Sequence, residues 1–233
     1  HVLYTDFLAA QTHANYLGSG RWYPYPPDLK TTADARNEKA FWNYVRTDPR
    51  NLEMVQMIAH YISNVIEDGY IENRVLNNFP GTLGYGLEKL RERHFEQILT
   101  VTQLIEQEDE ESHIFESILQ IMLSYAKFGE IKYGDEPLSD ERIQAVFGLI
   151  TDIDSALMSR SGKDRLNVVN MVLVRCWDHI ESFCEECKKR QEEAITSGGS
   201  ASLAETLSEV LGAIAGGSEI GEGRCTPVPE AAD

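Results

Sequence analysis

Several residues between positions 51 and 77 recur at the spacing that brings side chains onto one face of a helix. Successive members are four, three and four positions apart: His60, Asn64, Glu67 and Ile71. Glu67 follows an isoleucine and lies at the edge of the apolar face. A carboxylate in that position requires a cation, a hydrogen bond or a raised pKa. The pattern indicates either a metal-ligating carboxylate or an acidic stripe that water solvates.

The other candidates near Glu67 are less specific. Asp68 and Glu72 form a neighbouring acidic stripe, four positions apart. His60 is a metal ligand, a partner that orients a ligand, or a core histidine with a satisfied ring, and we expect the core histidine. The remaining histidines that we considered show no ligand spacing and are expected at the surface: His13, His94 and His113.

The four cysteines do not form a disulfide framework. Cys176, Cys184 and Cys187 share one predicted helix, and Cys225 lies in a polar tail. A small cysteine-bound metal site needs ligands that surround the metal ion tetrahedrally, and the spacing of cysteines within one continuous helix is poor for that arrangement. We therefore expect buried or half-exposed thiols on a helix, in a reducing cytoplasm.

Composition excludes several classes of partner. The 233 residues carry a formal net charge of −17, which repels nucleic-acid phosphates and anionic membranes. No apolar run reaches the ~18 residues of a membrane span. The glycines between 81 and 86 do not form a phosphate loop, and no serine–histidine–acid arrangement is recognisable.

Periodicity predicts an all-α fold. Successive ranges with helical spacing are 1–18, 33–46, 51–77 (which we expect Gly69 to interrupt), 87–106, 114–128, 139–158 and 165–195. Residues 21–27 form an aromatic, proline-rich loop. Composition shifts after residue 197, so we predict a helical domain at 1–197 and a disordered, Gly/Ser/Glu-rich acidic linker at 198–233, with a short amphipathic piece at 203–214.

Three segments resemble a known family. Residues 1–7 (His-Val-Leu-Tyr-Thr-Asp-Phe), residues 20–24 (Gly-Arg-Trp-Tyr-Pro) and residues 67–72 (Glu-Asp-Gly-Tyr-Ile-Glu) are similar to bacterial zincin-like metallopeptidase domains. Those domains precede an acidic linker and a von Willebrand factor A (VWA) domain. The cobaltochelatase large subunit and nitric-oxide-reductase activation proteins are more distantly similar in layout.

The resemblance implies a zinc site that this chain contains in part. His1 would be the last residue of a His-Glu-x-x-His motif, and Glu67 would be a zinc ligand from a facing helix. Asp68, Glu72 or His60 would orient a ligand. The family's other histidine and its water-activating glutamate would precede His1. We therefore expect no catalytic residue in this chain, which would be an inactive fragment of a zinc-dependent peptidase.

An alternative function is binding without catalysis. The distant relatives imply a scaffold that pairs with an AAA+ ATPase of the MoxR type in chaperone-like or metal-insertion work. The acidic surface would then dock a basic face of that partner. A plain helical interaction module, whose acidic residues only maintain solubility, is the third alternative.

Overall fold

The computed structural model describes residues 4–108, 113–196, 202, 205–207 and 211. The described residues are all-α and contain no strand, as the periodicity predicts. The helices are α1 (Phe7–Gly18), α2 (Thr32–Thr47), α3 (Pro49–Asn78), α4 (Thr82–Gln97), α5 (Val101–Glu108), α6 (Ile114–Phe128), α7 (Glu141–Phe147), α8 (Ile150–Met158), α9 (Gly162–Arg175) and α10 (Trp177–Thr196). Within these residues, no helix combines the length and the apolar character needed to cross a membrane.

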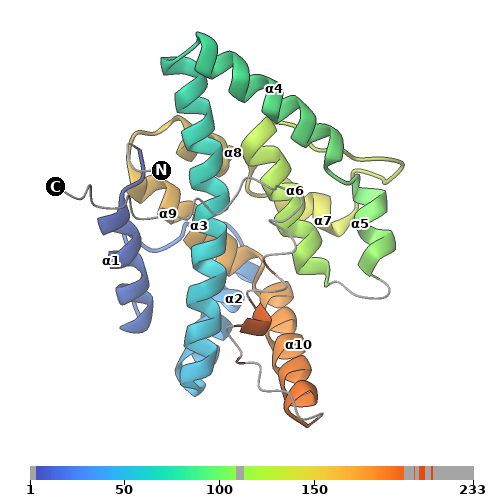
Figure 1. Cartoon of the computed structure of the whole chain (residues 1–233). Helices are drawn as coiled ribbons and strands as arrows, with labels where there is room; N and C mark the ends of the chain where they lie inside the picture. Colours follow the sequence, from blue (N-terminus) through green and yellow to red (C-terminus); the bar gives the residue numbers. More distant parts are fainter. Residues whose placement is uncertain (1–3, 109–112, 197–201, 203–204, 208–210, 212–233) are drawn as a thin grey trace, which may run out of the picture.

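Helix α3 forms the centre of the fold. It spans 30 residues and runs through the middle of the molecule, with α1 on one side and α6 on the other (Figure 1). Its N-terminus is fixed by Asp48, which accepts a hydrogen bond from the backbone of Arg50, and by Pro49 in the first turn. The fully buried row Met54, Ile58, Ile62 and Ile66 lies in the core.

Gly69 does not interrupt α3, contrary to our prediction. A Cβ atom at Gly69 would lie 2.3 Å from the carbonyl oxygen of Ala126, which belongs to α6. The missing side chain therefore allows the backbones of α3 and α6 to approach closely. The helix continues to Asn78 and carries Glu67 and Glu72 on a single rigid element.

The predicted helix at 87–106 is divided into α4 and α5. Ile98 has an extended backbone and ends α4. Thr100 caps the start of α5 by two reciprocal hydrogen bonds. The backbone N–H of Gln103 donates to Thr100 Oγ1, and the side-chain oxygen of Gln103 accepts from the backbone N–H of Thr100. This is a capping box of the type Thr-x-x-Gln. The same signal is visible in the sequence.

The two later predicted helices are also divided. The range 139–158 breaks after Phe147, where Gly148 ends α7 and Leu149 precedes α8. The range 165–195 bends at Cys176, whose backbone N–H donates to Val172 while its carbonyl accepts from Ile180. Cys176 therefore ends α9 and begins α10 without a glycine or proline.

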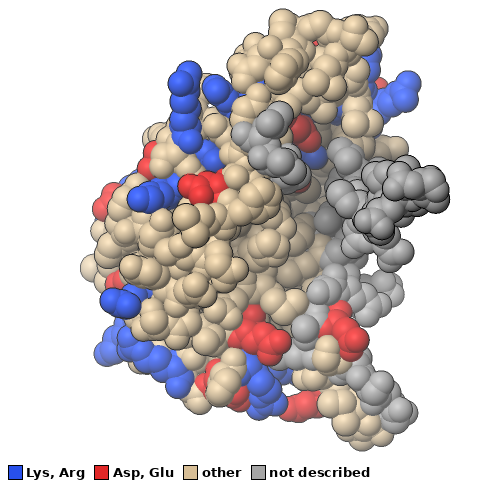
Figure 2. All heavy atoms as spheres, turned by 60° about the vertical axis from the view of Figure 1, so that its left-hand side comes forward, with Lys and Arg blue, Asp and Glu red and all other residues tan. Residues whose placement is uncertain are grey.

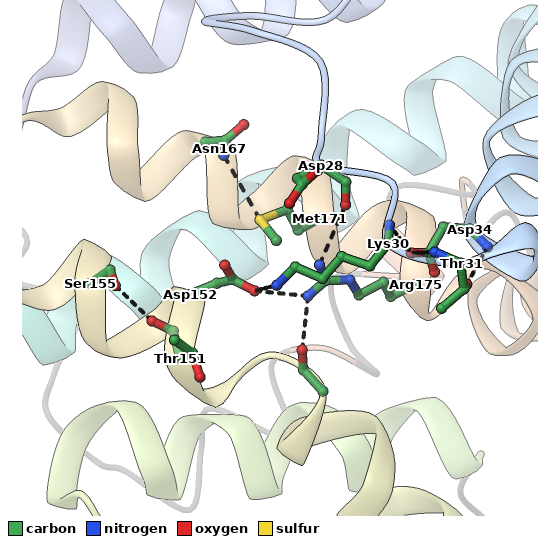
Figure 3. A network of polar contacts seen from close by, with 11 residues as sticks. Asp28, Lys30, Thr31, Asp34, Thr151, Asp152, Ser155, Asn167, Met171 and Arg175 are labelled. Atoms are coloured by element: carbon green, nitrogen blue, oxygen red, sulfur yellow. Dashed lines mark hydrogen bonds and ion pairs between the residues drawn. The ribbon is translucent and has the colours of Figure 1, made fainter.

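A polar network holds the loop before α2 against α8 and α9 (Figure 3). Asp152 accepts from Lys30 at 3.2 Å and from Arg175 at 2.9 Å. Arg175 also donates to the carbonyl oxygen of Gly148 at 2.8 Å. In the same loop region Trp22 stacks on Phe41 with ring centroids 4.8 Å apart, so this tryptophan packs against the core.

The predicted linker begins at 198, and the structure describes only a few of its residues. Leu207 and Leu211, four positions apart, are buried in the hydrophobic core. They belong to the amphipathic piece that we predicted at 203–214, and these two leucines pack in the core of the helical domain. Apart from residues 202, 205–207 and 211, the predicted linker lies outside the described residues.

Candidate metal centre

A small cavity lies beside Glu67, between the start of α1, the middle of α3 and the start of α9. Its volume is about 80 Å³. Its polar lining residues are Thr5, Asp6, His60, Ser63, Asn64 and Glu67. The structure thus places His60, Asn64 and Glu67 along one cavity wall, as their helical spacing predicts.

Glu67 is held by a buried arginine from α9. Arg165 Nε donates to Glu67 Oε1 at 2.5 Å, and the two side chains are 2% and 9% exposed. The Arg165 guanidinium lies 3.7 Å from the centre of the Tyr70 ring and donates to the carbonyl oxygens of Ser159 and Ser161 at 3.2 and 3.3 Å. These contacts fix the arginine and thereby orient the carboxylate.

The second oxygen of Glu67 has no hydrogen-bond partner among the described residues. This atom, Oε2, is buried. Burial raises the pKa of Glu67, Arg165 opposes that rise, and the carboxylates of Asp6 and Asp68 add to it. An additional cation would therefore be stabilised beside Oε2, because the carboxylate has lost water and gained only one counter-charge.

Asp6 closes the cavity from α1. Its Oδ1 accepts from the backbone N–H of Ala9 at 3.0 Å and caps the helix. A Cβ atom at Gly162 would lie 2.8 Å from the Cβ of Asp6, so only glycine permits this approach of α1 to the first turn of α9. The arrangement brings the carboxylate of Asp6 close enough to Glu67 to affect its pKa.

His60 lies at the exposed edge of the cavity, so our prediction of a core histidine is wrong. Its Nε2 lies 3.3 Å from Nδ2 of Asn64. The buried histidine is His13, which we predicted at the surface. His13 Nε2 lies 2.8 Å from Oδ1 of Asn170, and burial lowers the pKa of the His13 ring.

Glu72 and Asp68 do not line the cavity. Glu72 lies 3.0 Å from the buried Lys127 Nζ and 3.7 Å from Arg91, so it faces α6 and α4. Burial raises the pKa of Asp68, and the charge of Lys127 opposes that rise. The residue that orients Glu67 is instead Arg165, which our sequence reasoning missed. Its sequence signal is an arginine directly before the apolar run that begins at Leu166 in α9.

Among the candidate residues, Glu67 is the one with a buried oxygen beside the cavity that has no hydrogen-bond partner among the described residues. Carboxylate oxygen is an ordinary zinc donor, and Oε2 is unpartnered beside a polar cavity. The described part of the chain contains no group of three or more His, Cys, Asp and Glu side chains that could hold a metal. His1 lies outside the described residues.

The cysteines are free thiols in the core, as predicted. Cys176, Cys184 and Cys187 are buried, and burial raises the pKa of each thiol to about 12. A high pKa disfavours the thiolate that metal binding requires. Cys225 lies outside the described residues.

Comparison of the chain with models of protein families, with curated proteins and with solved structures found no match.

Proposed function

We propose that this chain carries part of a zinc site of a peptidase-like helical domain, in which Glu67 binds zinc through Oε2. The observation that carries the proposal is the buried, unpartnered Oε2 beside the polar cavity. The resemblance of residues 1–7 to a zincin-like family supports His1 as a second ligand. His60 and Asn64 lie along the same wall and can hydrogen-bond a water molecule or a ligand there.

The residues of this chain would prepare the carboxylate for the metal. Arg165 fixes Oε1 and leaves Oε2 as the free donor. Zinc, when bound, supplies a Lewis acid that polarises a peptide carbonyl or lowers the pKa of water. The resemblance assigns the water-activating glutamate to a position that these 233 residues do not include. We therefore expect zinc binding without peptide hydrolysis from this chain.

Zinc titration by calorimetry tests the proposal. The unmodified chain should bind zinc, and Glu67→Gln should weaken that binding at least ~10-fold, the usual scale for loss of a ligand or its support. Two controls remove the same charge elsewhere on α3: Glu72→Gln at a partly buried site and Glu53→Gln at an exposed one. Both should stay within ~3-fold of the unmodified chain.

Thermal unfolding of each variant shows whether it is folded during the titration. Absence of zinc binding by the unmodified chain contradicts the proposal. Equal affinity of the unmodified chain and Glu67→Gln contradicts it as well.

A second proposal, favoured by the net charge of −17, is a scaffold that docks a basic face of an AAA+ ATPase of the MoxR type in the cytoplasm. On the face shown in Figure 2, most atoms are uncharged and acidic and basic side chains lie mainly near the margins, so no extended acidic patch is visible among the described residues of that face. Binding between the chain and such an ATPase should fall strongly between about 50 and 500 mM salt. Binding that does not change with salt contradicts charge-driven docking.

A further inference from the structure

A second, larger cavity lies at the opposite end of α3 from the start of α4. It is an open depression of the surface with a volume of about 540 Å³, bordered by the C-terminal half of α2, the first turn of α3 and the middle of α10. The lining residues that matter here are Tyr44, Asp48, Asn51, Glu181, Glu185 and Lys188. Asn51 lies about 24 Å along α3 from Glu67, so this cavity is separate from the candidate metal centre.

Asn51 is the residue that points to a ligand. Its side chain is 4% exposed and lines the cavity. Nδ2 donates to the carbonyl oxygen of Tyr44 at 2.9 Å, but Oδ1 has no hydrogen-bond partner among the described residues. A buried acceptor without a partner is destabilising. A ligand that brings an N–H or O–H donor to Oδ1 removes that cost.

The surrounding charges favour a cation as the donor. Glu185 Oε1 accepts from Tyr44 at 2.9 Å and from Lys188 at 2.8 Å, and Asp48 is paired with Arg50. Glu181 differs from these two acids. Burial raises the pKa of Glu181, the neighbouring carboxylates of Glu185 and Asp178 raise it further, and Trp177 and the charge of Lys188 only partly oppose this rise. An added positive charge in the cavity would stabilise the ionised Glu181.

We propose that this cavity binds an alkyl guanidinium group, which donates N–H bonds to Asn51 Oδ1 and to the carboxylate of Glu181. Both residues line the cavity, one from α3 and one from α10, and a planar group with several donors is suited to two acceptors on different helices. An ammonium group has three donors around a single nitrogen and spans less distance. The guanidinium comes from an arginine side chain or from a small guanidine.

Binding of blocked arginine and lysine amides tests the proposal on the full chain. N-acetylarginine amide should bind saturably and at least 3-fold more tightly than N-acetyllysine amide. It should also shift the NMR signals of the Asn51 side-chain amide, a readout that needs no variant. No saturable binding of the arginine compound, or equal binding of the lysine compound, overturns the proposal.

Glu181→Gln should weaken binding of the arginine compound at least 5-fold. The matched control Glu53→Gln removes the same charge from an exposed position on α3 and should change binding less than 2-fold. An unchanged affinity of Glu181→Gln overturns the proposal. Comparison of methylguanidine with a blocked Gly-Arg-Gly peptide then distinguishes the two sources of the guanidinium group. Tighter binding of the peptide supports an arginine side chain in a protein segment, and equal binding supports a small guanidine.

Discussion

Helix α3 presents two carboxylates to two different faces of the fold, and their environments differ. Glu72 is partly buried and faces α6 and α4, where Lys127 lies 3.0 Å from Oε1 and Arg91 lies 3.7 Å from Oε2. Glu67 is buried and faces α9 and α1, where Arg165 donates to Oε1 and a polar cavity lies beside the residue. The Oε2 atoms of both residues are buried and have no hydrogen-bond partner among the described residues, but Glu72 is paired with two cations and Glu67 with one.

The difference separates a structural ion pair from a candidate binding site. Two cations around Glu72 compensate for the loss of water and tie three helices together. One cation at Glu67 leaves the negative charge of the carboxylate partly uncompensated, and the neighbouring carboxylate of Asp6 adds further negative charge. Proteins tolerate such uncompensated negative charge where a bound ligand supplies the positive charge. The following variants test this comparison, in order of decreasing expected effect.

Arg165→Met should cause the largest loss of stability. It removes the one cation that contacts Glu67 among the described residues and leaves the buried carboxylate without that counter-charge. We expect a loss of about 3–5 kcal/mol in the free energy of unfolding at pH 7, measured by urea denaturation. The control Arg175→Met breaks the partly exposed ion pair with Asp152 and should cost less. A loss below about 1 kcal/mol in Arg165→Met would show that Glu67 does not depend on this pair.

Gly69→Ala should cause an intermediate loss. The added Cβ would lie 2.3 Å from the backbone oxygen of Ala126 and would push apart the helices on the Glu72 face. We expect a loss of about 1–3 kcal/mol in urea denaturation. Gly86→Ala is the matched control, because a Cβ there meets nothing within 4 Å and alanine favours the helix. Equal stability of the two variants would mean that α3 and α6 can separate without cost.

The pH dependence of stability should show opposite contributions from Glu67 and Asp164. The raised pKa of Glu67, caused first by burial, means that the folded state holds its proton more tightly than the unfolded state. Its contribution therefore lowers the free energy of unfolding as pH rises from about 4.3 through the raised pKa. Glu67→Gln should remove this part of the decline.

Asp164 serves as the comparison on α9. Hydrogen bonds from Ser159 and Tyr25 lower the pKa of Asp164, so its stabilisation is present above about 3.9 and is lost as pH falls through the lowered value. Asp164→Asn should remove this loss at acidic pH. Urea denaturation between pH 3 and 7 measures both slopes, and an unchanged slope in Glu67→Gln would contradict the raised pKa.

The part of the site that lies on one helix could be predicted from the sequence. The spacing of His60, Asn64 and Glu67 places them on one face, because helical geometry depends only on local sequence. Arg165 lies 98 positions from Glu67, so no local pattern pairs them. The exposure of His60 also depends on how α1 and α9 pack on α3, which periodicity does not specify.

The fold class follows from periodicity, whereas several helix ends do not. The end of α4 could have been found from Thr100 and Gln103, whose spacing is that of a capping box. The bend at Cys176 has no such signal in the sequence, because no glycine or proline lies there and Cys176 and Trp177 are both buried. The prediction for Gly69 is wrong because this glycine allows a close contact with α6 and does not break α3.

The most direct test of the difference between Glu67 and Glu72 is a crystal structure of the chain grown with zinc, with anomalous diffraction collected at the zinc edge. The account predicts an anomalous peak about 2.0–2.2 Å from Oε2 of Glu67, with Arg165 still bonded to Oε1. A peak at Glu72, or zinc bound only at sites away from Glu67, would contradict it.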